Sequence, residues 1–230
     1  MKKILKLLLA ILLLPFVFGI MTETVVACWQ VFRNFQNAID FLAGMALYIV
    51  IHWKVYQFDR MYVFSHEITH AIMAMLFGFR IHEMKVGKNG GHVKMDRSNT
   101  VVALAPYCIA FYVMCVGIVY VGISLFYPVE KIRVLFVFLT GFFMAFHFIK
   151  TIQTLWETQQ PDLKMAGGSV FSIVMILLCN ALMLSLVLKC LFPADVSLLE
   201  IAYGTRNATE HLWQIVINYI ISLFSSVANS

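Results

Sequence analysis

Charged side chains are scarce in this chain. Asp, Glu, Lys and Arg make up 13% of its 230 residues, whereas apolar residues make up 61% and the mean hydropathy is +0.85. Such values lie outside the range of ordinary soluble domains. They favour an integral membrane protein with several spanning helices, and at this length they leave no room for a large separate soluble domain.

Other signals are missing as well. The five cysteines include no Cys-x-x-Cys pair, which argues against a disulfide framework and against a thiolate zinc site. The net charge of +5 is modest and scattered along the chain. This distribution is more typical of the Lys and Arg residues that flank membrane segments than of a nucleic-acid-binding surface. We therefore expect the lipid bilayer as a partner and no nucleic acid.

The N-terminus carries three lysines within its first six residues, followed by a Leu-rich run that continues to Ile20. This pattern is typical of a secretory signal peptide or of a first membrane anchor. No A-x-A cleavage site is evident and apolar residues resume at Val25, so we interpret residues 1–30 as an uncleaved anchor. The style of this N-terminus favours a bacterial inner membrane.

Further apolar stretches predict more membrane helices, which together with the anchor make about six. They cover approximately 39–57, 61–79, 100–127, 132–156 and 168–192. Pro106, inside the fourth of these stretches, is expected to kink its helix. The tail, 193–230, is more polar and is expected to end in an amphipathic or short spanning helix over 211–227. The fold class expected for 1–230 is therefore a single, all-α, multi-pass membrane domain, with its core at 60–190.

Residues 80–98 differ in character from the stretches around them. Apolar and polar residues alternate on either side of Asn89-Gly90, which predicts a short β-hairpin. The outer strand of such a hairpin has a free edge that can hold an extended peptide, so Gly90 and Gly91 are candidates for a loop beside a substrate. The alternative is a simple basic connector between two helices.

The stretch 61–79 contains the sequence His66-Glu67-Ile68-Thr69-His70. Two histidines four residues apart lie on the same face of a helix, so both imidazoles can reach one ion, most often zinc. Glu67 is placed beside them, where a carboxylate can take a proton from a metal-bound water and pass it to a leaving amine. Such groups are costly in an apolar helix unless they face the protein interior or a wet cavity, which makes them a functional-site candidate.

A catalytic zinc ion needs a third protein ligand. Asp162 is the preferred candidate because it is an acidic residue between two apolar segments, flanked by Pro161 and a pair of glycines. His147, within the apolar stretch 132–156, is the alternative ligand. It could equally contact one of the residues that bind the metal, bind the substrate carbonyl, or be a buried core histidine. Glu157 is a weaker third choice.

An HExxH sequence inside a membrane helix, a hairpin-like loop after it and a distant Asp at a turn resemble the site-2 protease family of intramembrane zinc metalloproteases. Ala71 and Gly78 fall where the HExxHA…G pattern of that family places small residues. The resemblance covers approximately residues 60–190. The chain differs from the family in lacking an inserted PDZ-like domain, and in reading Asp162-Leu163 where the family usually has an Asp-Gly pair.

The resemblance implies that His66, His70 and Asp162 hold Zn²⁺ and that Glu67 is the catalytic base. The expected activity is that of a zinc metalloendopeptidase that hydrolyses transmembrane or membrane-proximal protein substrates. A transmembrane helix hides its carbonyls in hydrogen bonds, so a substrate must unwind locally first. The alternatives are a catalytically silent, metal-binding membrane protein and a transporter component whose buried His and Glu residues carry protons or ions.

Overall fold

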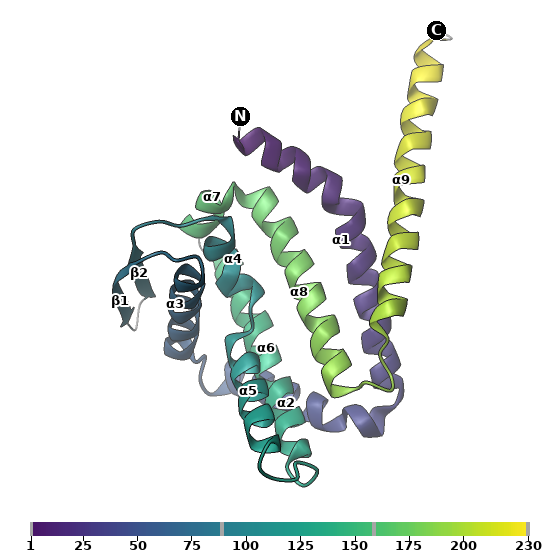
Figure 1. Cartoon of the computed structure of the whole chain (residues 1–230). Helices are drawn as coiled ribbons and strands as arrows, with labels where there is room; N and C mark the ends of the chain where they lie inside the picture. Colours follow the sequence, from purple (N-terminus) through teal and green to yellow (C-terminus); the bar gives the residue numbers. More distant parts are fainter. Residues whose placement is uncertain (1, 88–89, 158–159, 229–230) are drawn as a thin grey trace. The chain divides into compact units, whose positions relative to one another are not determined.

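The computed structural model describes residues 2–87, 90–157 and 160–228, which are mostly helical (Figure 1). The helices are α1 (Lys2–Arg33), α2 (Phe35–Lys54), α3 (Asp59–Leu76), α4 (Thr100–Cys108), α5 (Phe111–Ser124), α6 (Arg133–Glu157), α7 (Pro161–Ala166), α8 (Ser169–Leu191) and α9 (Leu198–Ala228). The chain divides into two compact units. One comprises Asn34–Ser172 and contains the HExxH helix, α3; the other comprises Met1–Arg33 and Ile173–Ser230.

Three helices are long and apolar enough to cross a membrane: α1, α6 and α8. Two further pairs, α2 with α3 and α4 with α5, are bent by 117° and 74° at short breaks, and they raise the number to five if each pair is one span. The expectation of a mostly helical chain with several helices long and apolar enough to cross a membrane is confirmed. The described helices supply three to five candidate spans, fewer than the expected six, because α2 and α3 form one bent pair where the sequence predicts two separate spans.

The turn between α2 and α3 is held by aromatic packing. Phe58 has a φ of 56°, in the left-handed region that non-glycine residues rarely adopt. Its ring lies 5.0 Å from that of Tyr56, 6.1 Å from that of Tyr48 and 6.3 Å from that of Phe142, centroid to centroid. These contacts offset the cost of the turn and fix the point at which α3 begins.

Two polar contacts anchor the first turn of α3 to neighbouring helices. The buried ammonium of Lys150 on α6 lies 2.6 Å from a carboxylate oxygen of Asp59. The hydroxyl of Tyr112 on α5 donates a hydrogen bond of 3.0 Å to the carbonyl of Met61. The helix that carries the two histidines is therefore tied at its start to both α5 and α6.

The kink expected at Pro106 lies further along the chain. Pro106 is inside α4, and the chain leaves the helix at Ile109, whose φ of −110° and ψ of 114° are extended. The helix continues beyond the proline because Ile109 still donates its N–H to the carbonyl of Ala105, at 2.9 Å. A proline has no N–H, so Pro106 cannot donate to the carbonyl of Val102, one turn earlier.

Helices α2 and α6 pack unusually closely. A Cβ added at Gly44 would collide with the carbonyl of Phe138, and one added at Gly141 would collide with the carbonyl of Phe41. Small residues of this kind let helix backbones approach each other in membrane proteins. The contact fixes how α6 is rotated relative to α2, with the buried Tyr48 in the core between them.

The predicted hairpin is confirmed. Strands β1 (Ile81–Gly87) and β2 (Gly90–Met95) pair antiparallel, from Ile81↔Met95 to Gly87↔Gly90, with an irregularity between Ile81 and Glu83. Lys88 and Asn89, which the sequence places in the turn, lie outside the described residues. Both strands pack beside α3 (Figure 1).

In the other unit, α1 is one continuous helix to Arg33, and it extends beyond the Leu-rich run that ends at Ile20. The hydroxyls of Thr24 on α1 and Ser185 on α8 lie 2.9 Å apart. A Cβ at Gly19 would lie 2.9 Å from the carbonyl of Thr205, so α1 and α9 also approach closely. Helix α9 extends over residues 198–228, well beyond the expected 211–227.

Gly141→Ala is expected to destabilise the protein, because its Cβ would overlap the backbone of α2. Overpacking of this kind costs about 1–3 kcal/mol. Thermal unfolding in detergent should show a lower midpoint than that of the wild type. Gly117→Ala on α5 is the control, since no atom lies within 4 Å of its added Cβ. Equal midpoints for the two variants would contradict the close packing of α2 and α6.

Candidate metal centre

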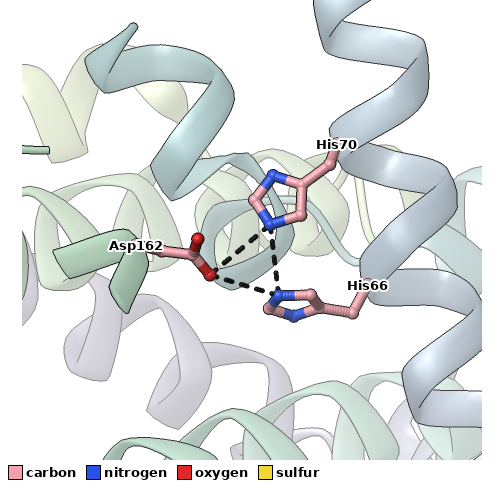
Figure 2. A group of neighbouring side chains, drawn as sticks. All are labelled: His66, His70 and Asp162. Atoms are coloured by element: carbon pink, nitrogen blue, oxygen red, sulfur yellow. Dashed lines mark hydrogen bonds and ion pairs between the residues drawn. The ribbon is translucent and has the colours of Figure 1, made fainter. Parts of the chain in front are cut away.

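Both histidines of the HExxH sequence point from α3 toward the carboxylate of Asp162 on α7 (Figure 2). The Nε2 atoms of His66 and His70 lie 3.2 Å apart. Oδ2 of Asp162 is 3.4 Å from Nε2 of His66 and 3.5 Å from Nε2 of His70. Within residues 2–87, 90–157 and 160–228, these three form the group of His, Cys, Asp and Glu side chains that could hold a metal ion.

The short helix α7 places Asp162 at this point. Gln160 is extended, Pro161 occupies the first helical position, where its missing N–H has no cost, and Gly167 ends the helix with a φ of 139°. The hydroxyl of Thr100, at the start of α4, donates a hydrogen bond of 3.1 Å to the carbonyl of Ala166. Helix α7 is therefore bounded by proline and glycine and is attached to α4.

His70 is oriented by the backbone of α4. Its Nδ1 lies 2.8 Å from the carbonyl oxygen of Val102. A carbonyl can only accept, so Nδ1 carries the proton and Nε2 presents its lone pair to Asp162 and His66. This carbonyl receives no helical hydrogen bond because the residue four positions later is Pro106. The proline thus leaves an acceptor that the histidine uses.

The carboxyl of Asp162 is ionised. Burial raises the pKa of this carboxyl, but the adjacent imidazole side chains of His66 and His70 outweigh that effect and hold it well below its usual range. Its side chain is only 16% exposed. Two imidazole nitrogens and one carboxylate oxygen are a donor set suited to a divalent transition-metal ion.

A cavity of about 560 Å³ opens beside the three side chains. Glu67 lines it without belonging to the metal-binding group, and its side chain is almost completely buried. The opposite wall is formed by β2 and the residues that follow it, 91–98. Since the sheet has only two strands in the part of the chain that the structure describes, the unpaired edge of β2 borders the same cavity as Glu67 and the three side chains that could hold a metal ion.

The two glycines expected beside a substrate have different positions. Gly91 lines the cavity, and a Cβ there would lie 2.7 Å from Cγ of Glu67 and 2.8 Å from Cγ1 of Val63. The backbone of β2 thus lies directly over Glu67, and only glycine leaves room for this approach. Gly90 pairs with Gly87 at the end of the ladder and has a φ of 136°.

The alternative ligands are not part of this group. His147 is buried on α6 and lines a small cavity of about 10 Å³ with Tyr62 and Ser65 of α3. It therefore lies close to the HExxH helix, but Asp162 is the residue that meets the two histidines. Glu157 is the last residue of α6, and its side chain lies outside the described residues.

Sequence reasoning missed two groups that contact the site. One is the carbonyl of Val102, which no side-chain pattern can reveal, although the proline four residues later was a signal of a free acceptor. The other is Tyr107, whose hydroxyl donates to Oδ2 of Asp162 at 3.1 Å. A tyrosine in an apolar helix usually finds a partner for its hydroxyl, but sequence alone does not say which.

Chemically, the site combines three side chains that could hold a metal ion, an adjacent carboxylate and a strand edge around one cavity. If a metal ion bound to these three side chains, Glu67 would line the same cavity as a water molecule or carbonyl oxygen bound to that ion. The chain matches no family model, no curated protein and no solved structure. The arrangement of these side chains is therefore the basis for any functional conclusion.

Gly91→Ala is expected to loosen the hairpin from α3, because the added Cβ collides with Glu67, Val63 and the carbonyl of Lys85. A cost of about 1–3 kcal/mol would raise the population of the open hairpin roughly 5- to 150-fold. Trypsin cleavage at Lys85 and Lys94 should accelerate accordingly. Gly122→Ala, where nothing lies within 4 Å of the new Cβ, is the control. An unchanged cleavage rate for Gly91→Ala would mean that β2 does not dock over Glu67.

Proposed function

We propose that this protein is an intramembrane zinc metalloprotease, similar to the site-2 protease family. It would hydrolyse peptide bonds of transmembrane or membrane-proximal proteins. The observation that carries the proposal is that His66, His70 and Asp162 meet, although α3 and α7 lie far apart in the sequence. Glu67 lines the same cavity.

The spacing of the three donor atoms supports zinc. Ligand atoms at 2.0–2.2 Å from a tetrahedral zinc ion stand roughly 3.3–3.6 Å apart. The distances among His66, His70 and Asp162 are 3.2, 3.4 and 3.5 Å. Three protein ligands leave a fourth position for water or substrate, which is the pattern of catalytic and not of structural zinc sites.

Glu67 is the proton carrier in this proposal. Bound zinc would supply the acidity of the attacking water and the polarisation of the scissile carbonyl. Glu67 accepts a proton from that water and delivers it to the leaving amine, a transfer that requires the carboxylate to face the cavity without ligating the metal. Its burial beneath the backbone of Gly91 holds the carboxylate in one place and limits the access of bulk water.

The edge of β2 is the element that would hold the substrate. In this proposal an extended peptide adds to the unpaired edge as a further strand, and backbone hydrogen bonds carry most of the affinity. This edge borders the cavity from Gly91 onward, so a peptide placed there would pass over the metal-binding residues. A transmembrane substrate would have to unwind locally in order to bind in this way.

The membrane setting follows from the long apolar helices. We propose a multi-pass protein of a bacterial inner membrane, in which α1, α6 and α8 span the bilayer and each bent pair contributes a further crossing. Residues 215–224 of α9 expose several large apolar side chains, and lipid contact, or a short sixth span, explains them best. The basic N-terminus is the basis for the assignment to a bacterial membrane.

The purified wild-type protein is expected to hold about one zinc ion per chain. His66→Ala and Asp162→Ala should each lose it, because two remaining ligands bind zinc weakly. Elemental analysis of detergent-purified protein after gel filtration makes this measurement. His147→Ala is the matched control and should retain the metal, since His147 lies outside the triad. A wild type that stays free of zinc even after zinc is added back would contradict the proposal.

Glu67→Gln is expected to retain zinc and lose hydrolysis by a factor of roughly 10²–10⁴, because the isosteric amide cannot accept the proton. Wild type and variant are incubated with a detergent-solubilised bacterial membrane proteome, and new peptide N-termini are mapped by amine labelling. Wild type should generate termini that are absent with the variant and absent after zinc chelation. Identical sets of termini from both proteins would reject a proteolytic role and favour a silent metal-binding protein or a transporter component.

A further inference from the structure

Tyr107, on α4, contacts two of the three proposed metal ligands, Asp162 and His66. Its side chain is fully buried. Its hydroxyl donates a hydrogen bond of 3.1 Å to Oδ2 of Asp162, the same oxygen that faces the two histidines. Its ring also meets that of His66 edge-on, with centroids 5.1 Å apart and an interplanar angle of 86°. One residue therefore touches ligands on both α3 and α7.

Asp162 depends on such contacts for its orientation. It is carried by a helix of only six residues, and so short a helix has little rigidity of its own. A carboxylate on it can turn about its own side-chain bonds unless a donor fixes one oxygen. Tyr107 supplies this donor from the neighbouring helix.

The hydroxyl of Tyr107 has a second acceptor nearby. Oε1 of Gln160 lies 3.2 Å from it, and Nε2 of Gln160 donates to the carbonyl of Thr154, also at 3.2 Å. A hydroxyl has one proton and can fully donate to one acceptor at a time. The ionised carboxylate of Asp162 is the stronger acceptor, because hydrogen bonds to charged oxygens are stronger than those to neutral ones.

We propose that Tyr107 is a positioning residue of the metal centre, whose hydroxyl fixes the carboxylate of Asp162 with Oδ2 toward His66 and His70. This inference rests on the proposed function in one respect, namely that the three residues bind a metal ion. Helix α4 then orients ligands from two sides: the carbonyl of Val102 fixes His70, and Tyr107 fixes Asp162. Groups that orient metal ligands in this way typically contribute 10- to 100-fold to metal affinity.

Tyr107→Phe tests the proposal because it removes the hydroxyl and keeps the ring that contacts His66. Zinc affinity is measured by competition with a chromophoric chelator, with the detergent-purified full chain. We expect binding to weaken by about 10- to 100-fold. Tyr112→Phe is the matched control, since Tyr112 also donates a single hydrogen bond, to the carbonyl of Met61, but has no contact with Asp162. This control should bind zinc like the wild type.

A second readout separates positioning from simple packing. In the cobalt-substituted protein, Tyr107→Phe should change the visible absorption bands, which report the geometry of the metal ligands. In an Asp162→Asn background, the same substitution should cost little further affinity, because the group through which Tyr107 acts has lost its charge. The melting temperature of metal-free Tyr107→Phe should be close to that of metal-free Tyr112→Phe.

The outcomes distinguish the two proposals. A wild type that binds no zinc would overturn both. A wild type that binds zinc, with equal affinity and an unchanged cobalt spectrum in Tyr107→Phe, would overturn the positioning role alone. Equal losses of affinity in Tyr107→Phe and Tyr112→Phe, or an undiminished loss in the Asp162→Asn background, would assign Tyr107 a role in stability and overturn the inference in the same way.

Discussion

The cost of burying polar side chains among apolar ones favours contacts between them, and this constraint shapes the structure around α3. Burial without a hydrogen bond or an opposite charge is costly, most of all in a protein as apolar as this one. His66, His70 and Asp162 meet one another, and the carbonyl of Val102 and the hydroxyl of Tyr107 meet two of them from α4. Polar contacts among these few groups therefore contribute, together with apolar packing, to the arrangement of the elements around α3.

The role of α4 depends on its proline. A regular helix uses its carbonyls internally, so it has few acceptors to offer a neighbour. Pro106 releases the carbonyl of Val102 without ending the helix, which continues to Cys108. The kink expected at the proline is replaced by a change of direction at Ile109, whose N–H still finds the carbonyl of Ala105 one turn earlier. The proline thus leaves the carbonyl of Val102 for His70, whereas the chain leaves the helix three residues later, at Ile109.

The parts of the site that depend on residues close together in the sequence could be predicted from the sequence. The spacing of His66 and His70 places them on one helical face, and alternation around Asn89-Gly90 predicts the hairpin. The choice between Asp162 and His147 could not be settled in this way, because it depends on how α6 is rotated, and the packing of Gly44 and Gly141 against α2 sets that rotation. Val102 and Tyr107 were missed because their contacts join segments that lie far apart in the sequence.

The position of Asp162 on the short helix α7 has a consequence for the stability of the whole unit Asn34–Ser172. A metal ion shared by His70 and Asp162 would act as a cross-link, closing a ring of about ninety residues. Covalent cross-links that close rings of this size reduce the conformational entropy of the unfolded chain by the equivalent of roughly 4–5 kcal/mol. Such an ion would then stabilise the part of the chain between α3 and α7, which includes the hairpin, α4, α5 and α6, against unfolding.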